Sequence, residues 1–152
     1  MREAGPDSVA ERMGLIDTTT EFGRRAEGRL HEEKLAWLTT VDRAGTPQPI
    51  PVWFLWDGAD SILIYSRPET PKLRSIERHP RVSLNLDGNG RGGDIVVATG
   101  EAAVSIDPPA HEVPAYVEKY ASLIERNNWT PESFAGDYSV PIRISIRRIR
   151  GF

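Results

Sequence analysis

The most restrictive feature of this sequence is a proline at every second position of Pro47–Pro51, within a segment that otherwise has strand character. Alternate residues of a strand direct their backbone groups to the same edge, so these prolines remove every N–H donor from one edge. The intervening residues still serve the other edge. The segment can therefore pair fully on one side only. Two interpretations stay open: an outer strand protected against aggregation, or a backbone wall left free for a flat ligand.

The rest of the chain alternates short strand patterns with turn signals, of which Asp57-Gly58 is the strongest hairpin signal. Six strands joined mostly by hairpins predict a mainly β fold, an antiparallel barrel with peripheral helices. In Val140–Arg150 the isoleucines alternate on one side until Arg147-Arg148 breaks the period. The expected strands are Ala36–Val41, Gln48–Trp56, Ser61–Ser66, Arg81–Asp87, Asp94–Ile106 and Val140–Arg150, and the expected helices are Thr18–Lys34, Thr70–Arg78, Pro108–Glu125 and a short turn at Trp129–Gly136.

Length and composition limit the organisation and the class of protein. A chain of 152 residues with 39% hydrophobic residues suits one domain with one core. We expect residues 1–17 to form a mobile leader and residues 18–152 to form the domain. A net charge of −3 argues against a nucleic-acid binder. Without an apolar run of about 18–20 residues, we expect no membrane span and a cytoplasmic location.

Most catalytic and metal-binding motifs are missing from the sequence. There is no cysteine, and the three histidines are isolated from one another, so we expect no metal site. The glycine-rich segment 88–94 lacks the Gly-Lys-Ser/Thr of a phosphate-binding loop. A distant Ser-His-Asp arrangement cannot be judged from sequence, and no catalytic residue is identified.

A second constellation lies where a strand gives way to a helix, in Tyr65–Lys72. Thr70 is a typical N-cap and Pro71 a favoured first helical residue, which places Lys72 in the first turn. Two cations, a hydroxyl and free N–H groups at a helix N-terminus suit a phosphate, with Ser66 and Arg67 contributing. The alternative is an ion pair of Lys72 with Glu69 or Glu77. Combined with the proline-rich wall, the pattern indicates a flat phosphorylated ligand such as flavin mononucleotide (FMN).

The order LAWLTTVDRAGTPQPIPVWFLWDG, then SILIYSRPETPKLRSIERHPRVSLNLD, with RIRGF at the C-terminus, resembles the pyridoxamine 5′-phosphate oxidase-like split barrels. Within them it is most similar to the actinobacterial flavin/deazaflavin oxidoreductases that use coenzyme F420. The resemblance implies a six-stranded antiparallel split β-barrel, and a homodimer with a cofactor in each of two sites at the subunit interface.

The resemblance also implies roles for particular residues. The cofactor ring would lie along Pro49, Ile50, Pro51, Val52 and Trp53, and the phosphate would be held by Tyr65, Ser66, Arg67 and Lys72. The partner's C-terminal strand, ending at Phe152, would close the site. Two departures stand out: the C-terminus lacks the histidine that pyridoxamine 5′-phosphate oxidases use, and Pro71-Lys72 stands where they have an Arg-Lys pair.

These observations support an oxidoreductase that transfers a hydride from reduced coenzyme F420 to an unsaturated small molecule. The alternatives are an FMN-dependent oxidase and a cofactor-binding protein without turnover. Arg24, Arg25 and Arg29 could contact the anionic tail of the deazaflavin, or could simply be solvated. A homodimer is also expected because Trp37, Trp53, Phe54 and Trp56 are many large apolar residues for one small barrel to bury.

Overall fold

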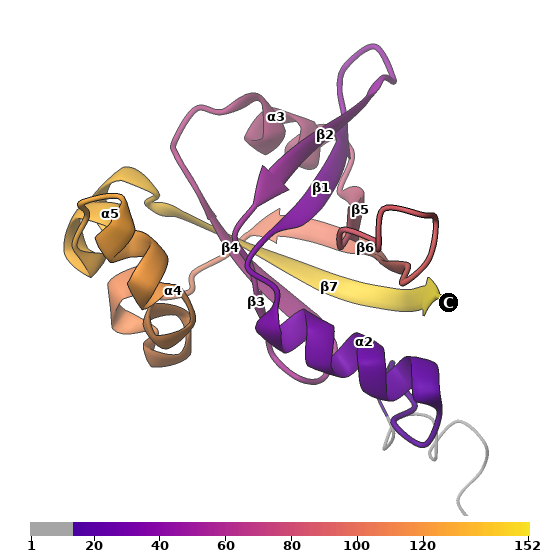
Figure 1. The fold of residues 1–152 in the computed structure, drawn as a ribbon. Helices are drawn as coiled ribbons and strands as arrows, with labels where there is room; N and C mark the ends of the chain where they lie inside the picture. Colours follow the sequence, from indigo (N-terminus) through magenta and orange to yellow (C-terminus); the bar gives the residue numbers. More distant parts are fainter. Residues whose placement is uncertain (1–13) are drawn as a thin grey trace, which may run out of the picture.

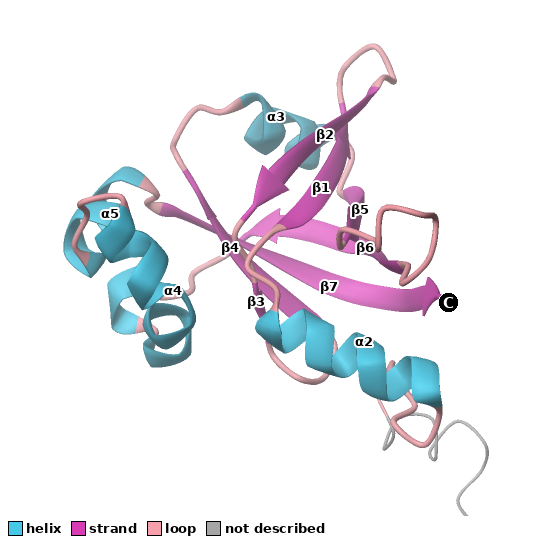
Figure 2. Cartoon of the chain, in the orientation of Figure 1, coloured by secondary structure: helices cyan, strands magenta, loops and turns pink. Residues whose placement is uncertain are grey.

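The computed structural model describes residues 14–152, which form a curled antiparallel sheet with helices around it (Figures 1 and 2). None of the helices in that range is long and apolar enough to cross a membrane. The strands are β1 (Ala36–Val41), β2 (Pro47–Val52), β3 (Leu55–Trp56), β4 (Ser61–Ser66), β5 (Arg81–Asn85), β6 (Val96–Val104) and β7 (Val140–Gly151). The helices are α2 (Glu21–Glu32), α3 (Pro71–Arg78), α4 (Pro114–Arg126), α5 (Pro131–Asp137) and the 3₁₀ turn η1 (Ala110–Glu112).

The sheet has the order β2-β1-β5-β6-β7-β4-β3, and all of its pairings are antiparallel. The proline-rich strand β2 lies at one edge and pairs only with β1, as the alternating prolines predicted. The next strand in sequence, β3, lies at the opposite edge. Only Trp53 and Phe54 separate the two strands, and two residues span about 7 Å. The sheet must therefore curl until its edges almost meet, which gives the mainly β split barrel.

The expected single strand Gln48–Trp56 is wrong, because this segment forms two strands, β2 and β3. The sheet therefore has seven strands instead of the expected six. At Phe54 the backbone leaves the sheet, because its N–H and C=O bond to side chains of α4 instead of a neighbouring strand. The continuous strand pattern of the sequence does not reveal that the two halves pair with opposite edges.

The expected helix Pro108–Glu125 is also divided, into η1 and α4. Pro114 begins α4, and a residue that precedes proline is disfavoured in helical geometry. Val113 accordingly takes an extended conformation, with φ −104° and ψ 98°. The break lets α4 turn its buried face, Tyr116, Tyr120 and Ile124, toward the barrel opening.

The change of period in the last strand corresponds to a β-bulge. Thr99 pairs with Arg148 and Gly100 with Ile146, so Arg147 is the extra residue of β7. Gly100 is required here, because a Cβ at this position would lie 2.0 Å from the Ser145 carbonyl oxygen. Residues 140–145 of β7, before the bulge, pair with β4, whereas residues 148–151, beyond it, pair with β6 alone.

The buried residues form two clusters. The larger one fills the barrel beneath α2 and is mostly aliphatic, whereas the smaller one lies under α4 and α5 and is half aromatic. Figure 1 shows α2 and the α4–α5 pair on different sides of the sheet. Residues 1–13 of the expected leader lie outside the described residues. Its last part belongs to the domain, because Ile16 is only 7% exposed and joins the larger cluster.

Candidate functional site

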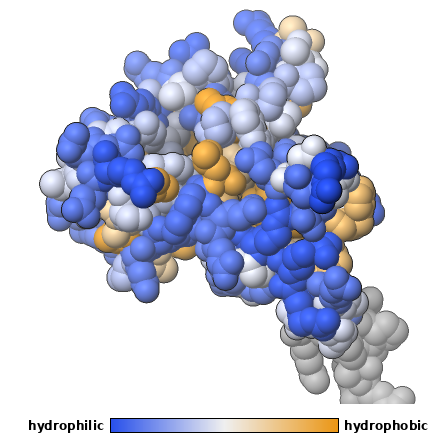
Figure 3. All heavy atoms as spheres, viewed as in Figure 1, coloured by the Kyte–Doolittle hydropathy of each residue, from blue (hydrophilic) through white to orange (hydrophobic). Residues whose placement is uncertain are grey.

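A cavity of about 580 Å³ opens where the split in the barrel faces α4 and α5. It brings together the end of β2, the end of β4, the start of α3 and the two helices. Figure 3 shows hydrophobic side chains reaching the surface near the end of β2, surrounded by hydrophilic residues. The lining residues are Leu35, Ile50, Pro51, Val52, Trp53, Tyr65, Arg67, Thr70, Lys72, Tyr116, Asn127, Trp129, Phe134 and Tyr138.

The two constellations predicted from sequence therefore meet in one cavity, although about a dozen residues separate them in the chain. The reason is topological. Strand β2 ends at one side of the split and β4, which leads into α3, lies beside the other. Closure of the barrel places the proline-rich wall opposite the first turn of α3.

Lys72 provides the cationic end of the cavity. Its Nζ donates to Ser66 Oγ at 3.1 Å, and Ser66 Oγ lies 3.0 Å from Thr70 Oγ1. Within residues 14–152 Lys72 forms no ion pair, so the expected alternative of a surface pair with Glu69 or Glu77 is wrong. Burial lowers the pKa of Lys72, because desolvation disfavours the ammonium form. A half-buried cation among hydroxyls is a site that an anion would complete.

The neighbouring residues contribute in different ways. The Arg67 guanidinium lies over the Tyr138 ring, 5.0 Å from its centroid, and lines the cavity. Ser66 is only 1% exposed and does not line the cavity, so it orients Lys72 instead of meeting a ligand. The Tyr65 hydroxyl donates to the Pro108 carbonyl at 2.6 Å, so its proton is not free for a phosphate. Tyr65 acts instead as part of the wall.

The opposite end of the cavity is aromatic. The ring of Trp53 stacks on Tyr120 with centroids 4.6 Å apart and planes at 4°, and on Phe134 at 5.2 Å. Trp129 and Tyr138 pack around Phe134 at 5.9 and 4.7 Å. Ile50 remains 40% exposed at the cavity mouth. Pro49, also expected in the ring wall, does not line the cavity, whose contact with β2 begins at Ile50 and runs to the end of the strand.

The backbone at the split is held by α4. The Phe54 N–H donates to the Tyr120 hydroxyl at 2.7 Å, and the Phe54 carbonyl accepts from Lys119 Nζ at 2.8 Å. Tyr120 Oη also lies 2.9 Å from the Lys34 carbonyl oxygen. These contacts satisfy backbone groups that no strand reaches. They also fix Trp53, the residue before Phe54, in the cavity wall.

Apart from Trp53, the sequence did not reveal the aromatic end of the cavity. Tyr116 lies within the expected helix Pro108–Glu125, but no pattern in the sequence links that helix to the proline-rich wall. Trp129, Phe134 and Tyr138 lie in and beside a short helix whose sequence carries no ligand motif. An available signal was the density of aromatic residues between positions 116 and 138.

The arginines of α2 do not line the cavity, and each of them contacts its own chain. Arg24 donates to the carbonyls of Thr18 and Thr19. Arg25 lies 3.6 Å from both Glu21 and Asp94 carboxylates. Arg29 pairs with Glu33 at 3.0 Å and donates to the backbone carbonyls of Asp87 and Asp94. These contacts tie α2 to the loop between β5 and β6.

Phe152 also lies outside the cavity of its own chain. Its side chain is 68% exposed, while its backbone pairs with Ile95.

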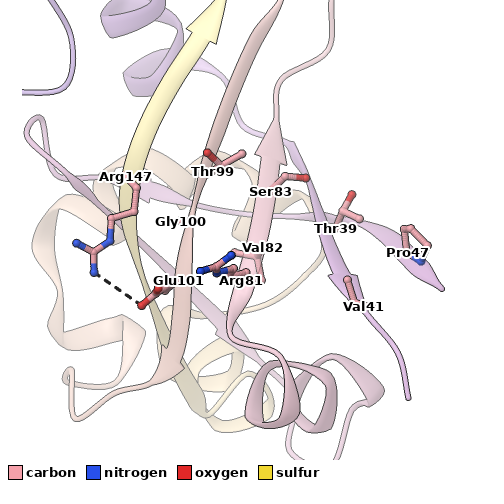
Figure 4. Close-up of a pocket in the computed structure, with 10 residues that line it drawn as sticks. All are labelled: Thr39, Val41, Pro47, Arg81, Val82, Ser83, Thr99, Gly100, Glu101 and Arg147. Carbon is pink, nitrogen blue, oxygen red and sulfur yellow. Dashed lines mark ion pairs between the residues drawn. The ribbon is translucent and has the colours of Figure 1, made fainter. Parts of the chain in front are cut away.

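A second hollow, of about 630 Å³, lies on the outer face of the sheet (Figure 4). Its floor contains the hydroxyl residues Thr39, Ser83 and Thr99, which are register partners on adjacent strands. At its rim Arg147 lies 3.7 Å from Glu101. No group of three His, Cys, Asp or Glu side chains suited to a metal ion occurs in the described residues.

Comparison with known proteins places the fold. At 23% identity, an F420 reductase structure superposes with a TM-score of 0.59 and covers 82% of this chain and 94% of that chain. A conserved hypothetical protein from Mycobacterium tuberculosis, also 23% identical, superposes with a TM-score of 0.62 and covers 86% of this chain and 82% of that chain. General stress protein 26 from Bacillus anthracis, 20% identical, superposes with a TM-score of 0.63 and covers 83% of this chain and 89% of that chain.

No curated protein matches the sequence. The sequence profile described as pyridoxamine 5′-phosphate oxidase matches residues 23–151, which include every strand of the sheet. This match extends over far more than half of the chain. With the split barrel and its cavity, it confirms the resemblance seen in the sequence: the chain belongs to the pyridoxamine 5′-phosphate oxidase family.

Proposed function

We propose that this protein is a flavin-type oxidoreductase that uses a deazaflavin, coenzyme F420, to reduce an unsaturated small molecule. One observation carries the proposal: the cavity joins a flat wall, Ile50–Trp53, to a cationic end formed by Lys72 and Arg67. The family match supports the flavin type. The likeness to a structure named F420 reductase, and the sequence resemblance, favour the deazaflavin over FMN.

The residues of the cavity fit such a cofactor. A phosphate beside Lys72 would receive a charge-assisted hydrogen bond and would offset the desolvation of its ammonium group. Arg67 lies near the mouth, where it can contact the phosphate or the chain that follows it. The apolar groups of Ile50, Pro51 and Val52 provide a surface for the tricyclic ring.

When bound, the reduced deazaflavin supplies a hydride, and the protein supplies orientation and shielding. Trp53 would limit the depth to which the ring enters, because its own ring is fixed between Tyr120 and Phe134. The aromatic walls would exclude water from a ring bound in the cavity. No residue is assigned as a proton donor to the substrate, and solvent would serve.

We also propose that the protein acts as a cytoplasmic homodimer. The sequence argument, that one small barrel cannot bury so many large apolar residues, holds only in part. A single chain buries Phe54 and Trp56, and Trp53 packs against the aromatic cluster. Better support comes from the large apolar side chains left exposed, namely Leu35, Trp37, Ile50, Val104, Ile106 and Phe152. Light scattering at micromolar concentration should give twice the monomer mass. A monomer would remove the shared site.

The cofactor assignment is tested by titrating the purified protein with coenzyme F420 and with FMN, following the fluorescence of each. Tighter binding of coenzyme F420 is expected. Tighter binding of FMN would support the FMN-dependent alternative instead. If coenzyme F420 binds, steady-state oxidation of its reduced form with a panel of unsaturated acceptors separates an enzyme from a binding protein without turnover.

A further inference from the structure

Two tyrosines one turn apart on α4 differ in a way that packing does not explain. Tyr116 and Tyr120 are 1% and 0% exposed, and their ring centroids are 4.9 Å apart. The Tyr120 hydroxyl contacts the Phe54 N–H and the carbonyls of Phe54 and Lys34. The Tyr116 hydroxyl has no hydrogen-bond partner among the residues that the structure describes.

An unpartnered buried hydroxyl destabilises a protein, so most buried polar groups are paired. Phenylalanine would fill the same space without this penalty. The neighbours of Tyr116 are rings: Tyr65 meets it edge-on at 5.1 Å, and Phe134 stacks at 5.9 Å. Tyr116 nevertheless lines the cavity, so a molecule bound there is the available source of an acceptor.

The surroundings also define the kind of acceptor. Burial raises the pKa of Tyr116 above its ordinary value, so its phenol stays neutral and offers a proton. A charged acceptor would be poorly solvated among aromatic rings. The anionic part of a ligand belongs instead at Lys72, where the cation and the hydroxyls lie. A neutral carbonyl oxygen on a flat ring meets both conditions.

We propose that the Tyr116 hydroxyl donates a hydrogen bond to a ring carbonyl of the cofactor that fills this cavity. This inference rests on the proposed function, since flavin and deazaflavin rings both carry such carbonyls. It gives the aromatic end of the cavity a role in orienting the ring, separate from the role of Lys72 at the phosphate.

The test compares Tyr116→Phe with the wild-type protein in titrations with coenzyme F420, FMN and riboflavin, which has the ring without the phosphate. Loss of one neutral hydrogen bond should weaken binding of all three roughly fivefold to tenfold. Lys72→Ala should weaken coenzyme F420 and FMN but leave riboflavin unchanged. The two substitutions thereby separate the ring contact from the phosphate contact.

Thermal melting of the cofactor-free protein provides a second readout with opposite signs. Tyr116→Phe should leave the melting temperature unchanged or raise it, because it removes an unpartnered hydroxyl. The matched control Tyr120→Phe should lower it, because the Phe54 N–H loses its acceptor.

Equal affinities of Tyr116→Phe and wild-type protein, or a lower melting temperature of the cofactor-free variant, would overturn this inference alone. A wild-type protein that binds none of the three molecules would overturn the proposed function as well.

Discussion

The barrel interior and the aromatic cluster under α4 and α5 are built from different kinds of side chain. The barrel cluster consists mainly of Ile, Leu, Val and Ala, with Leu38, Ile142 and Ile144 at 0% exposure. The aromatic cluster contains Tyr65, Tyr116, Tyr120 and Phe134, with Trp53 against it. Aliphatic side chains fill a closed barrel without polar atoms to satisfy, whereas phenols add hydrogen-bonding groups to an apolar surface.

The difference predicts that stability and ligand binding depend on separate regions. The barrel cluster holds the sheet and lies behind the site. Six members or neighbours of the aromatic cluster also line the cavity, namely Trp53, Tyr65, Tyr116, Trp129, Phe134 and Tyr138. Substitutions in the barrel should therefore change the free energy of unfolding alone, and substitutions in the aromatic cluster should also change ligand affinity.

The largest effect is expected for Ile144→Ala in the barrel. Deleting this fully buried side chain should lower the free energy of unfolding by about 2–5 kcal/mol. Urea denaturation measures this loss. The cofactor affinity of the folded protein should stay unchanged, whereas Phe134→Ala, from the other region, should lower both. A changed affinity in Ile144→Ala would contradict the separation of the two regions.

The next effect concerns the cationic end of the cavity. Lys72→Ala should weaken cofactor binding by about tenfold to a hundredfold, because an ion-paired phosphate contact contributes roughly 1.5–3 kcal/mol. Its melting temperature without cofactor should not fall, because a desolvated cation is removed. Arg74→Ala, an exposed cation on the same helix that does not line the cavity, is the control. An unchanged dissociation constant for Lys72→Ala would move the phosphate to Arg67 or elsewhere.

A smaller effect should appear in the pH dependence of stability. Burial, together with the nearby Lys34, lowers the pKa of Lys119 to about 8 from its ordinary 10.5. Between these values the unfolded chain binds more protons than the folded one, so this residue makes stability rise with pH from about 8 to 10.5. Denaturation at about pH 7.5 and about pH 9.5, on either side of the lowered pKa of Lys119, should show the rise in the free energy of unfolding.

Lys119→Gln should remove this rise, and Lys34→Gln should leave most of it. A rise of equal size in Lys119→Gln would assign it to other groups. At higher pH the sign reverses, because burial raises the pKa of Tyr65 to about 12 from 10.0 and the folded phenol keeps its proton longer.

The smallest expected effect is a difference in salt dependence between the two cofactors. If Arg25 or Arg29 contacts the anionic tail of coenzyme F420 in the dimer, that contribution should fade with salt, since exposed charges are screened over about 8–10 Å. Binding of coenzyme F420 should then weaken more steeply with salt than binding of FMN. Equal slopes would leave these arginines with their contacts inside the chain, to Glu21, Glu33, Asp87 and Asp94.

Local features of the chain were predictable from the sequence. Missing donors at Pro47–Pro51 required an edge strand, and β2 is one. Thr70 and Pro71 begin α3, and the isoleucines of β7 face the core until the bulge at Arg147. Each of these outcomes depends on backbone chemistry or on a period that neighbouring residues define among themselves.

Other outcomes needed the closed barrel. The sequence shows a continuous strand through Trp53 and Phe54, because it carries no sign that Tyr120 and Lys119, over sixty residues away, bond to the Phe54 backbone. Because of the same long-range packing, the Tyr65 hydroxyl donates to the Pro108 carbonyl and Arg29 donates to backbone carbonyls. The Tyr116 hydroxyl, in contrast, has no partner in the described residues. The sequence determined which residues could form a wall and a cationic site. Only the tertiary structure decided which of their polar atoms stay free, because that depends on partners distant in the chain.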